Sequence, residues 1–223
     1  DFCLSRGLGD VYKRQVHEGG HAVHSFLAHP LKLSAFKEYP MEIAEVASMA
    51  MELFSMDHWQ AFFENEADLK RAKEHQLERT ITIFPWIAII DQFQHWVYVH
   101  PQHTVEERTN EWMRILNDFS TSSIDYTGLD EFRKIGWQRQ LHLFEVPFYY
   151  IEYGIAQLGA IGLWMQYKQN PNNALENYMN ALSLGGTKTL PELYKAAGLE
   201  FNLTPAYIKT LMEFVKTEMD QLK

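Results

Sequence analysis

The sequence has little cysteine, little positive charge and no long apolar run. It contains one cysteine, Cys3, which cannot form a disulfide within the chain and fits a reducing compartment such as the cytoplasm. The net charge of −9, from 20 Lys and Arg against 29 Asp and Glu, argues against nucleic acid or an anionic membrane as the partner. The most apolar run, Ile81 to Ile90, is too short to span a bilayer and contains Pro85.

Residues 1–15 do not read as the start of a natural protein. They contain no Met and no basic-then-apolar signal segment. Residues 10–15, Asp-Val-Tyr-Lys-Arg-Gln, can be reverse-translated into the end sequence of a transposase used to fragment DNA for sequencing. We therefore predict that residues 1–15 are translated adaptor and that residues 16–223 are the authentic chain.

Composition and cap signals predict an all-α protein. Hydrophobic residues make up 46% of the 223 residues and aromatic residues 14%, enough for a globular fold with one sizeable core. We find no convincing alternating strand and no obvious linker, so we expect one all-α body.

Proline, glycine and capping residues set the expected helix boundaries. A break or kink is expected at Pro85, and Asn173 is expected to cap the helix that follows Gln169. The expected helical segments are Val16 to about Ala28, Pro40 to about Ser55, Asp57–Tyr98, Thr104–Phe119, Leu129–Gln140, Tyr149–Gln169, about Asn173 to Gly185, Thr189–Gly198 and Thr204 onward, with a turn over His142–Phe148.

The motif His17-Glu18-Gly19-Gly20-His21 carries the clearest chemistry. On a helix it places two imidazoles one turn apart on one face, which is typical of a zinc peptidase site. His17 and His21 are therefore candidate metal ligands, and Glu18 is the candidate general base for a water at the metal. Gly19 and Gly20 each cost about 1 kcal/mol relative to Ala in a helix. Either another backbone or a substrate approaches these glycines closely, or the protein tolerates the lower helix stability that they cause.

A hydrolytic zinc site needs a third protein ligand and one open position for water. Glu42, Glu45 and Glu52 all lie on the next predicted helix, and periodicity alone does not choose among them. His24, one turn beyond His21, is expected to pack or to support the site rather than to bind metal. Ser48 is expected to be a hydrogen-bonding residue of the helix face, because nothing pairs it with a base.

Two separated stretches resemble oligoendopeptidase F, of the thimet oligopeptidase family of zinc metallopeptidases. The first is His-Glu-Gly-Gly-His-Ala-Val-His at 17–24, followed by Tyr39-Pro40 and by Glu-Val-Ala-Ser at 45–48. The second is Trp-Gln-Arg-Gln-Leu-His at 137–142, followed by Pro-Phe-Tyr-Tyr-Ile-Glu-Tyr at 147–153. The resemblance runs from Val16 to the C-terminus and corresponds to the C-terminal portion of the family's longer chains.

The resemblance implies roles for individual residues. It makes Glu45 the third zinc ligand, and it makes the second stretch a substrate loop in which His142, Tyr150 and Tyr153 face the scissile carbonyl. Tyr149 stays open as an alternative to these tyrosines. A tyrosine hydroxyl, with a reference pKa of about 10, is protonated near neutrality and can donate to a developing oxyanion.

We therefore interpret residues 16–223 as the catalytic portion of a zinc endopeptidase that cuts short peptides internally. One Zn²⁺ is expected as the cofactor, short peptides as substrates, and the missing N-terminal portion of the same enzyme as a partner. One alternative is another zinc peptidase with the same motif, such as a carboxypeptidase. The other is a helical scaffold or inactive fragment without catalysis.

Overall fold

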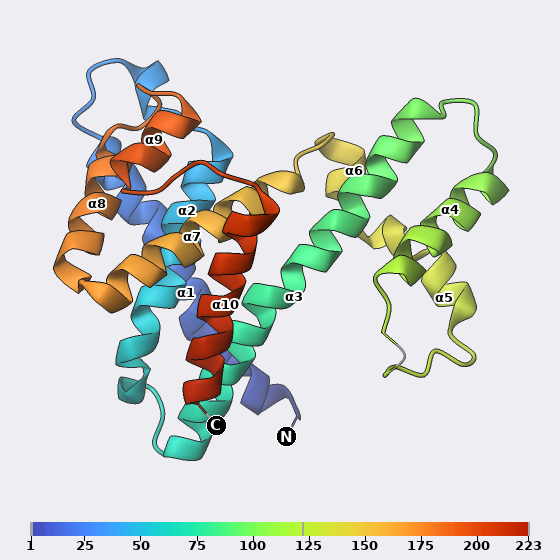
Figure 1. The fold of residues 1–223 in the computed structure, drawn as a ribbon, viewed down its shortest axis with the longest axis horizontal. Helices are drawn as coiled ribbons and strands as arrows, with labels where there is room; N and C mark the ends of the chain where they lie inside the picture. The colour runs from blue at the N-terminus through green and yellow to red at the C-terminus, as the bar shows by residue number, and fades with distance from the viewer. Residues whose placement is uncertain (1, 122, 223) are drawn as a thin grey trace. The chain divides into compact units, whose positions relative to one another are not determined.

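The computed structural model describes residues 2–121 and 123–222, with side chains from residue 13 onward (Figure 1). In the predicted adaptor segment, Asp1 and the side chains of residues 2–12, that of Cys3 among them, lie outside the described part, and the origin of the segment stays a prediction. No strand occurs in the described part of the chain, which confirms the all-α class. None of its helices combines the length and apolar character that a bilayer crossing needs.

The helices follow one another with short connections. Their bounds are α1 Phe2–Ala28, α2 Met41–Ser55, α3 Glu66–Val99, α4 Val105–Asp118, α5 Asp130–Lys134, α6 His142–Glu145, α7 Ile151–Gln169, α8 Pro171–Ser183, α9 Leu190–Ala196 and α10 Pro205–Gln221, with 3₁₀ helices at Ser34–Lys37, Met56–Ala61 and Gly136–Arg139.

The chain divides into two compact units, so the expectation of one body is wrong. The first unit comprises the residues up to Ile81 together with those from Ile155 onward, and the second is Thr82–Gly154. Both boundaries fall inside helices, α3 and α7, and no Gly- or Pro-rich linker marks them. A division of this kind leaves no compositional signal for sequence analysis to detect.

In the first unit, α1 packs along α2, and α8 and α9 lie against this pair (Figure 1). The contact surface of α2 is rich in small residues, with Ala47 and Ala50 fully buried beside Leu53. The Tyr178 hydroxyl of α8 donates to the Ala47 carbonyl at 2.8 Å, which ties α8 to the middle of α2.

The second unit has a core of its own. Ile89, Ile90 and Phe93 from α3 pack with Trp112 and Ile115 from α4. The indole N–H of Trp112 donates to the backbone carbonyl of Arg133, in α5, at 2.7 Å. The buried indole is thereby satisfied, as a polar group in a core must be.

Two segments differ from the prediction: one helix lacks the interruption expected in it, and another is interrupted where a continuous helix was expected. Helix α3 continues through Pro85, so the predicted break does not occur, and the alternative of a kink stays a prediction. Proline removes one helical hydrogen bond there, and burial of the apolar residues Ile87, Ile89 and Ile90 in the following turns favours the helix. Conversely, the predicted helix Leu129–Gln140 is divided into α5 and a 3₁₀ helix that begins at Gly136.

The predicted caps are mostly correct. Thr104 with Glu107 and Thr189 with Glu192 both form capping boxes, and the Thr204 side chain caps α10. The cap of α8 is Asn170 rather than Asn173, because Pro171 already occupies the first turn and the Asn170 side chain accepts from the Asn173 N–H.

The contact between α1 and α2 depends on Gly20. A Cβ placed on Gly20 would lie 2.5 Å from both the Ala47 carbonyl oxygen and the Ser48 Cα, which are backbone atoms of α2. A Cβ on Gly19 would meet nothing within 4 Å. Close backbone approach therefore explains Gly20 but not its neighbour.

Gly20→Ala and Gly19→Ala form a matched pair. Gly20→Ala must push α2 away, so we expect it to lower the free energy of unfolding by about 1–3 kcal/mol despite the better helix propensity of alanine. Gly19→Ala is expected to raise it by up to about 1 kcal/mol. Urea titration followed by helical circular dichroism measures both changes. Equal effects of the two substitutions would show that Gly20 does not control the helix contact.

Candidate metal centre

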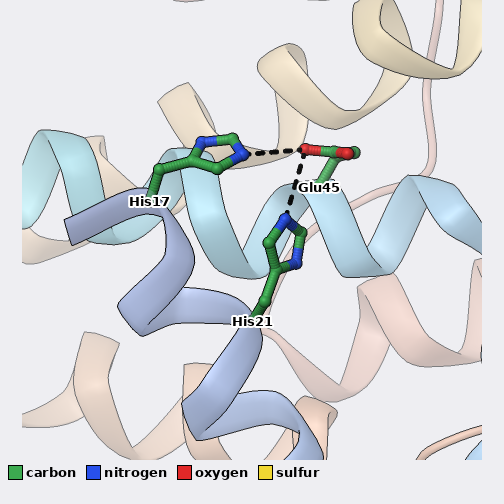
Figure 2. A group of neighbouring side chains, drawn as sticks. All are labelled: His17, His21 and Glu45. Carbon is green, nitrogen blue, oxygen red and sulfur yellow. Dashed lines mark ion pairs between the residues drawn. The ribbon is translucent and has the colours of Figure 1, made fainter. Parts of the chain in front are cut away.

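Three of the predicted ligands converge between α1 and α2. His17 and His21 project from α1 towards the carboxylate of Glu45 on α2 (Figure 2). The Glu45 Oε2 lies 3.6 Å from His17 Nε2 and 3.9 Å from His21 Nε2. Among the residues whose side chains are described, these three are the only group of His, Cys, Asp and Glu close enough to hold one metal ion.

The spacing of these atoms suits a metal better than a hydrogen bond. Direct hydrogen bonds would place nitrogen and oxygen about 2.7–3.2 Å apart. Ligand atoms around a tetrahedral zinc, with bonds of about 2.0–2.2 Å, lie about 3.3–3.6 Å from one another. The observed separations are close to that range, and the three ligand atoms lie within 4.8 Å of one another.

Local helix geometry explains how each ligand reaches the site. His17 and His21 are one turn apart, so their rings meet edge to face with centroids 5.0 Å apart. Glu45 is a buried carboxylate, 7% exposed. The Ser48 hydroxyl lies 3.0 Å from Glu45 Oε2 and 3.0 Å from the Glu45 carbonyl, in hydrogen-bond range of both. Ser48 thus has the predicted hydrogen-bonding role and helps to orient Glu45.

The other two glutamates of α2 are placed differently. Glu42 lies near Tyr194 of α9. Glu52 Oε1 is 2.7 Å from His17 Nδ1, and Glu52 Oε2 accepts from Gln76 Nε2 of α3 at 2.9 Å. This hydrogen bond with Glu52 raises the pKa of His17. Burial acts to raise the pKa of Glu52, but the hydrogen bonds from His17 and Gln76 outweigh it and leave that pKa lowered.

Glu18 and His24 lie on the same helix as the two candidate ligands, His17 and His21. The Glu18 side chain is exposed, so its carboxylate is accessible to water, and its charge also favours protonation of His17. His24 is fully buried and stacked on Tyr39, with ring centroids 3.4 Å apart. Burial lowers the pKa of His24 to about 4, so the ring is neutral at neutral pH. His24 packs, as expected, and is not part of the ligand group.

The predicted substrate-loop residues cluster in the second unit. The Tyr153 hydroxyl is 3.3 Å from His142 Nε2, and Gln140 Nε2 is 2.6 Å from His142 Nδ1. The His142 ring also contacts Tyr149 and Tyr150, with centroids 5.6 and 5.2 Å apart. Burial raises the pKa of Tyr150, which is packed in part against the core of this unit.

An unusual turn precedes the tyrosines. Phe148 has a φ of 59°, in the left-handed region that bulky residues rarely adopt. Its backbone N–H donates to the side chain of Gln94 on α3 at 3.0 Å, and its ring packs against His95 and Tyr98. These contacts hold the turn that leads into Tyr149 and Tyr150.

The structure thus brings the predicted residues together as two groups, one in each unit. His17, His21 and Glu45 form the first group, and His142 with the tyrosines forms the second. That His142 and the tyrosines face a scissile carbonyl stays a prediction. Sequence reasoning missed the partners of these groups, Gln76 and Gln140, and considered Glu52 only as a ligand.

The chain is similar to known peptidases. The model of Peptidase family M3 matches residues 9–213. An oligoendopeptidase F homolog of Borreliella burgdorferi is 25% identical over 218 residues, covering 93% of this chain and 35% of that protein. Oligopeptidase PepF of Bacillus subtilis is 24% identical over 213 residues, covering 93% of this chain and 31% of that protein.

A solved structure shows the same fold. PZ peptidase A with inhibitor 2 superposes with a TM-score of 0.85 at 28% identity, over 94% of this chain and 37% of that one. The chain therefore spans about a third of the length of the relatives that it matches. Because the family model matches nearly all of its residues, the chain belongs to Peptidase family M3.

Proposed function

We propose that this chain is the catalytic portion of a zinc-dependent endopeptidase that hydrolyses internal bonds of short peptides. The observation that carries the proposal is the convergence of His17 Nε2, His21 Nε2 and Glu45 Oε2, with Glu18 on the same helix turn as the histidines. Two imidazoles and one carboxylate are a ligand set that catalytic zinc uses in peptidases.

The residues present fit one zinc ion. His17, His21 and Glu45 would hold it and leave a position open, since catalytic zinc keeps a fourth site for water or substrate. A bound zinc would polarise the peptide carbonyl and bring the pKa of a water molecule towards neutrality. The two histidines are half-buried whereas Glu45 is buried, so a substrate would approach the metal from the histidine side.

Glu18 and the tyrosine cluster would supply the proton chemistry. Glu18 accepts a proton from the attacking water and transfers it to the leaving amine. The negative charge that develops on the carbonyl oxygen would accept hydrogen bonds from His142, Tyr150 and Tyr153. The contact between Tyr153 and His142 Nε2 supports Tyr153 as the main donor, with Tyr150 and Tyr149 as the alternatives.

The wider setting is part of the same proposal. The relatives named oligoendopeptidase and oligopeptidase support short peptides as substrates. Their greater length supports a further portion of the same enzyme, which we expect to be the N-terminal one. The absence of cysteine from residues 16–223 supports action in the cytoplasm.

The first prediction is that the chain, stripped with a chelator, binds one equivalent of zinc. Glu45→Ala removes a ligand, and we expect zinc affinity to fall more than the 10–100-fold that is typical of losing a supporting residue. Competition with a chromogenic chelator measures the affinity. Glu42→Ala, on the same helix, is the control and should bind as the wild type does. Unchanged binding by Glu45→Ala would exclude Glu45 as the third ligand.

The second prediction concerns Glu18→Gln in the full-length enzyme. The variant should keep its zinc and bind peptide, because no ligand changes, but kcat should fall on the order of 10²–10⁴-fold. Cleavage of internally quenched short peptides measures the rate, and zinc content is determined on the same samples. Glu64→Gln, at an exposed position, is the charge-matched control. Near-normal turnover by Glu18→Gln would move the base to another residue.

The third prediction is that Tyr153→Phe lowers kcat on the order of 10²-fold with a smaller change in KM, because the lost donor matters most when charge develops. The same substitution at Tyr150 and Tyr149 ranks the three hydroxyls, and Tyr98→Phe serves as the control. If none of the three cluster variants loses activity, the tyrosines are packing residues and the oxyanion is stabilised elsewhere.

A further inference from the structure

Glu52 connects a predicted metal ligand to the interior of the first unit. It lies seven residues after Glu45 on α2, about two helical turns, and therefore on the same face. One of its carboxylate oxygens contacts His17 Nδ1 at 2.7 Å and the other accepts from Gln76 at 2.9 Å. The Glu52 side chain is 17% exposed and Gln76 is 4% exposed, so the network is largely shielded from water.

The two nitrogens of the His17 ring face different partners. Nε2 faces Glu45 Oε2 at 3.6 Å, a separation near that of two ligands of one zinc. Nδ1 faces Glu52 at hydrogen-bond distance. A carboxylate accepts hydrogen bonds and does not donate them, so Glu52 favours the tautomer with the hydrogen on Nδ1 and the lone pair on Nε2.

We propose that Glu52 is a positioning residue, which acts through His17 and prepares its Nε2 to bind the metal, and that Gln76 holds Glu52 in place. The proposal rests on the proposed metal site. The proposal also gives α3 a part in that site, because Gln76 of α3 donates to the carboxylate of Glu52, which in turn contacts His17.

Geometry argues against Glu52 as a ligand itself. Both of its oxygens have partners, and neither partner is His21. The group of atoms that can share one ion contains Glu45 and not Glu52. A metal held by Glu52 and His17 Nδ1 would lose the other two members of the group.

The proposal also separates the two histidines. Within the described side chains, no carboxylate lies within ion-pair distance of His21 Nδ1, so His17 alone has this support. A carboxylate partner of this kind fixes the ring orientation and raises the basicity of the ligand, and its loss typically costs 10–100-fold in metal affinity. Removal of Glu52 should therefore act on the affinity through His17.

The experiment measures zinc affinity, by competition with a chelator, for Glu52→Ala, Glu52→Gln and Glu52→Asp. We expect affinity to fall about 10–100-fold in Glu52→Ala, and less in Glu52→Gln and Glu52→Asp, which keep an acceptor. Glu42→Gln removes one negative charge from the same helix without touching the histidines and should bind zinc as the wild type does. Urea titration identifies any variant that does not fold, and Glu52→Gln then carries the test because it preserves shape.

A second readout reports the ring directly. Long-range proton–nitrogen correlation spectra of the metal-free protein, at a pH where His17 is neutral, show which ring nitrogen carries the hydrogen. We expect Nδ1–H in the wild type and in Glu42→Gln, and a shift towards Nε2–H in Glu52→Ala. A merely structural role of Glu52 would leave the tautomer unchanged.

The outcomes are distinct. Weakened zinc binding with a changed tautomer in Glu52→Ala supports the proposal. Wild-type affinity in a folded Glu52→Ala or Glu52→Gln, while Glu45→Ala binds poorly, overturns the positioning role and leaves the metal site standing. A wild-type protein that binds no zinc overturns both the metal site and the role of Glu52 in it.

Discussion

The close approach of α1 and α2 at Gly20 is the constraint on which the site depends. Backbone atoms of α2 occupy the space that a side chain at Gly20 would need. The two helices therefore lie close enough for side chains at neighbouring positions to meet. His17 and His21, on either side of this contact, then reach the carboxylate of Glu45 without an intervening residue. The Tyr178 hydroxyl of α8 donates to the same Ala47 carbonyl that Gly20 approaches, and so ties α8 to α2 at this contact.

Burying carboxylates at such a contact is costly unless they are hydrogen-bonded. Glu45, which is buried, and Glu52, which is half-buried, both meet this requirement, each with its own polar partners. Glu45 has Ser48 on its own helix, and Glu52 has Gln76 from α3 together with His17. The result is an ordered set of acceptors facing the histidines, which would reduce the reorganisation needed to bind the proposed metal.

The sequence predicts the helical class, most caps and the metal-binding motif because these depend on local chemistry. Thr104 with Glu107 shows this, since a capping box involves residues only three apart. The third ligand is different. Glu45 and Glu52 lie on one face of α2, so only the crossing of α1 and α2 decides which oxygen reaches Nε2 and which reaches Nδ1. No local sequence pattern predicts the role of Gln76, because that role depends on where α3 packs. No local pattern marks the division of the chain inside α3 and α7 either.

The most direct test of this account is the position of the metal itself. Crystals of the zinc-loaded protein, measured on both sides of the zinc absorption edge, give an anomalous difference map. We expect one peak at about 2.0–2.2 Å from His17 Nε2, His21 Nε2 and a Glu45 oxygen, with Glu52 remaining on Nδ1. A peak coordinated by Glu52 in place of Glu45, or one away from the two histidines, would contradict the account.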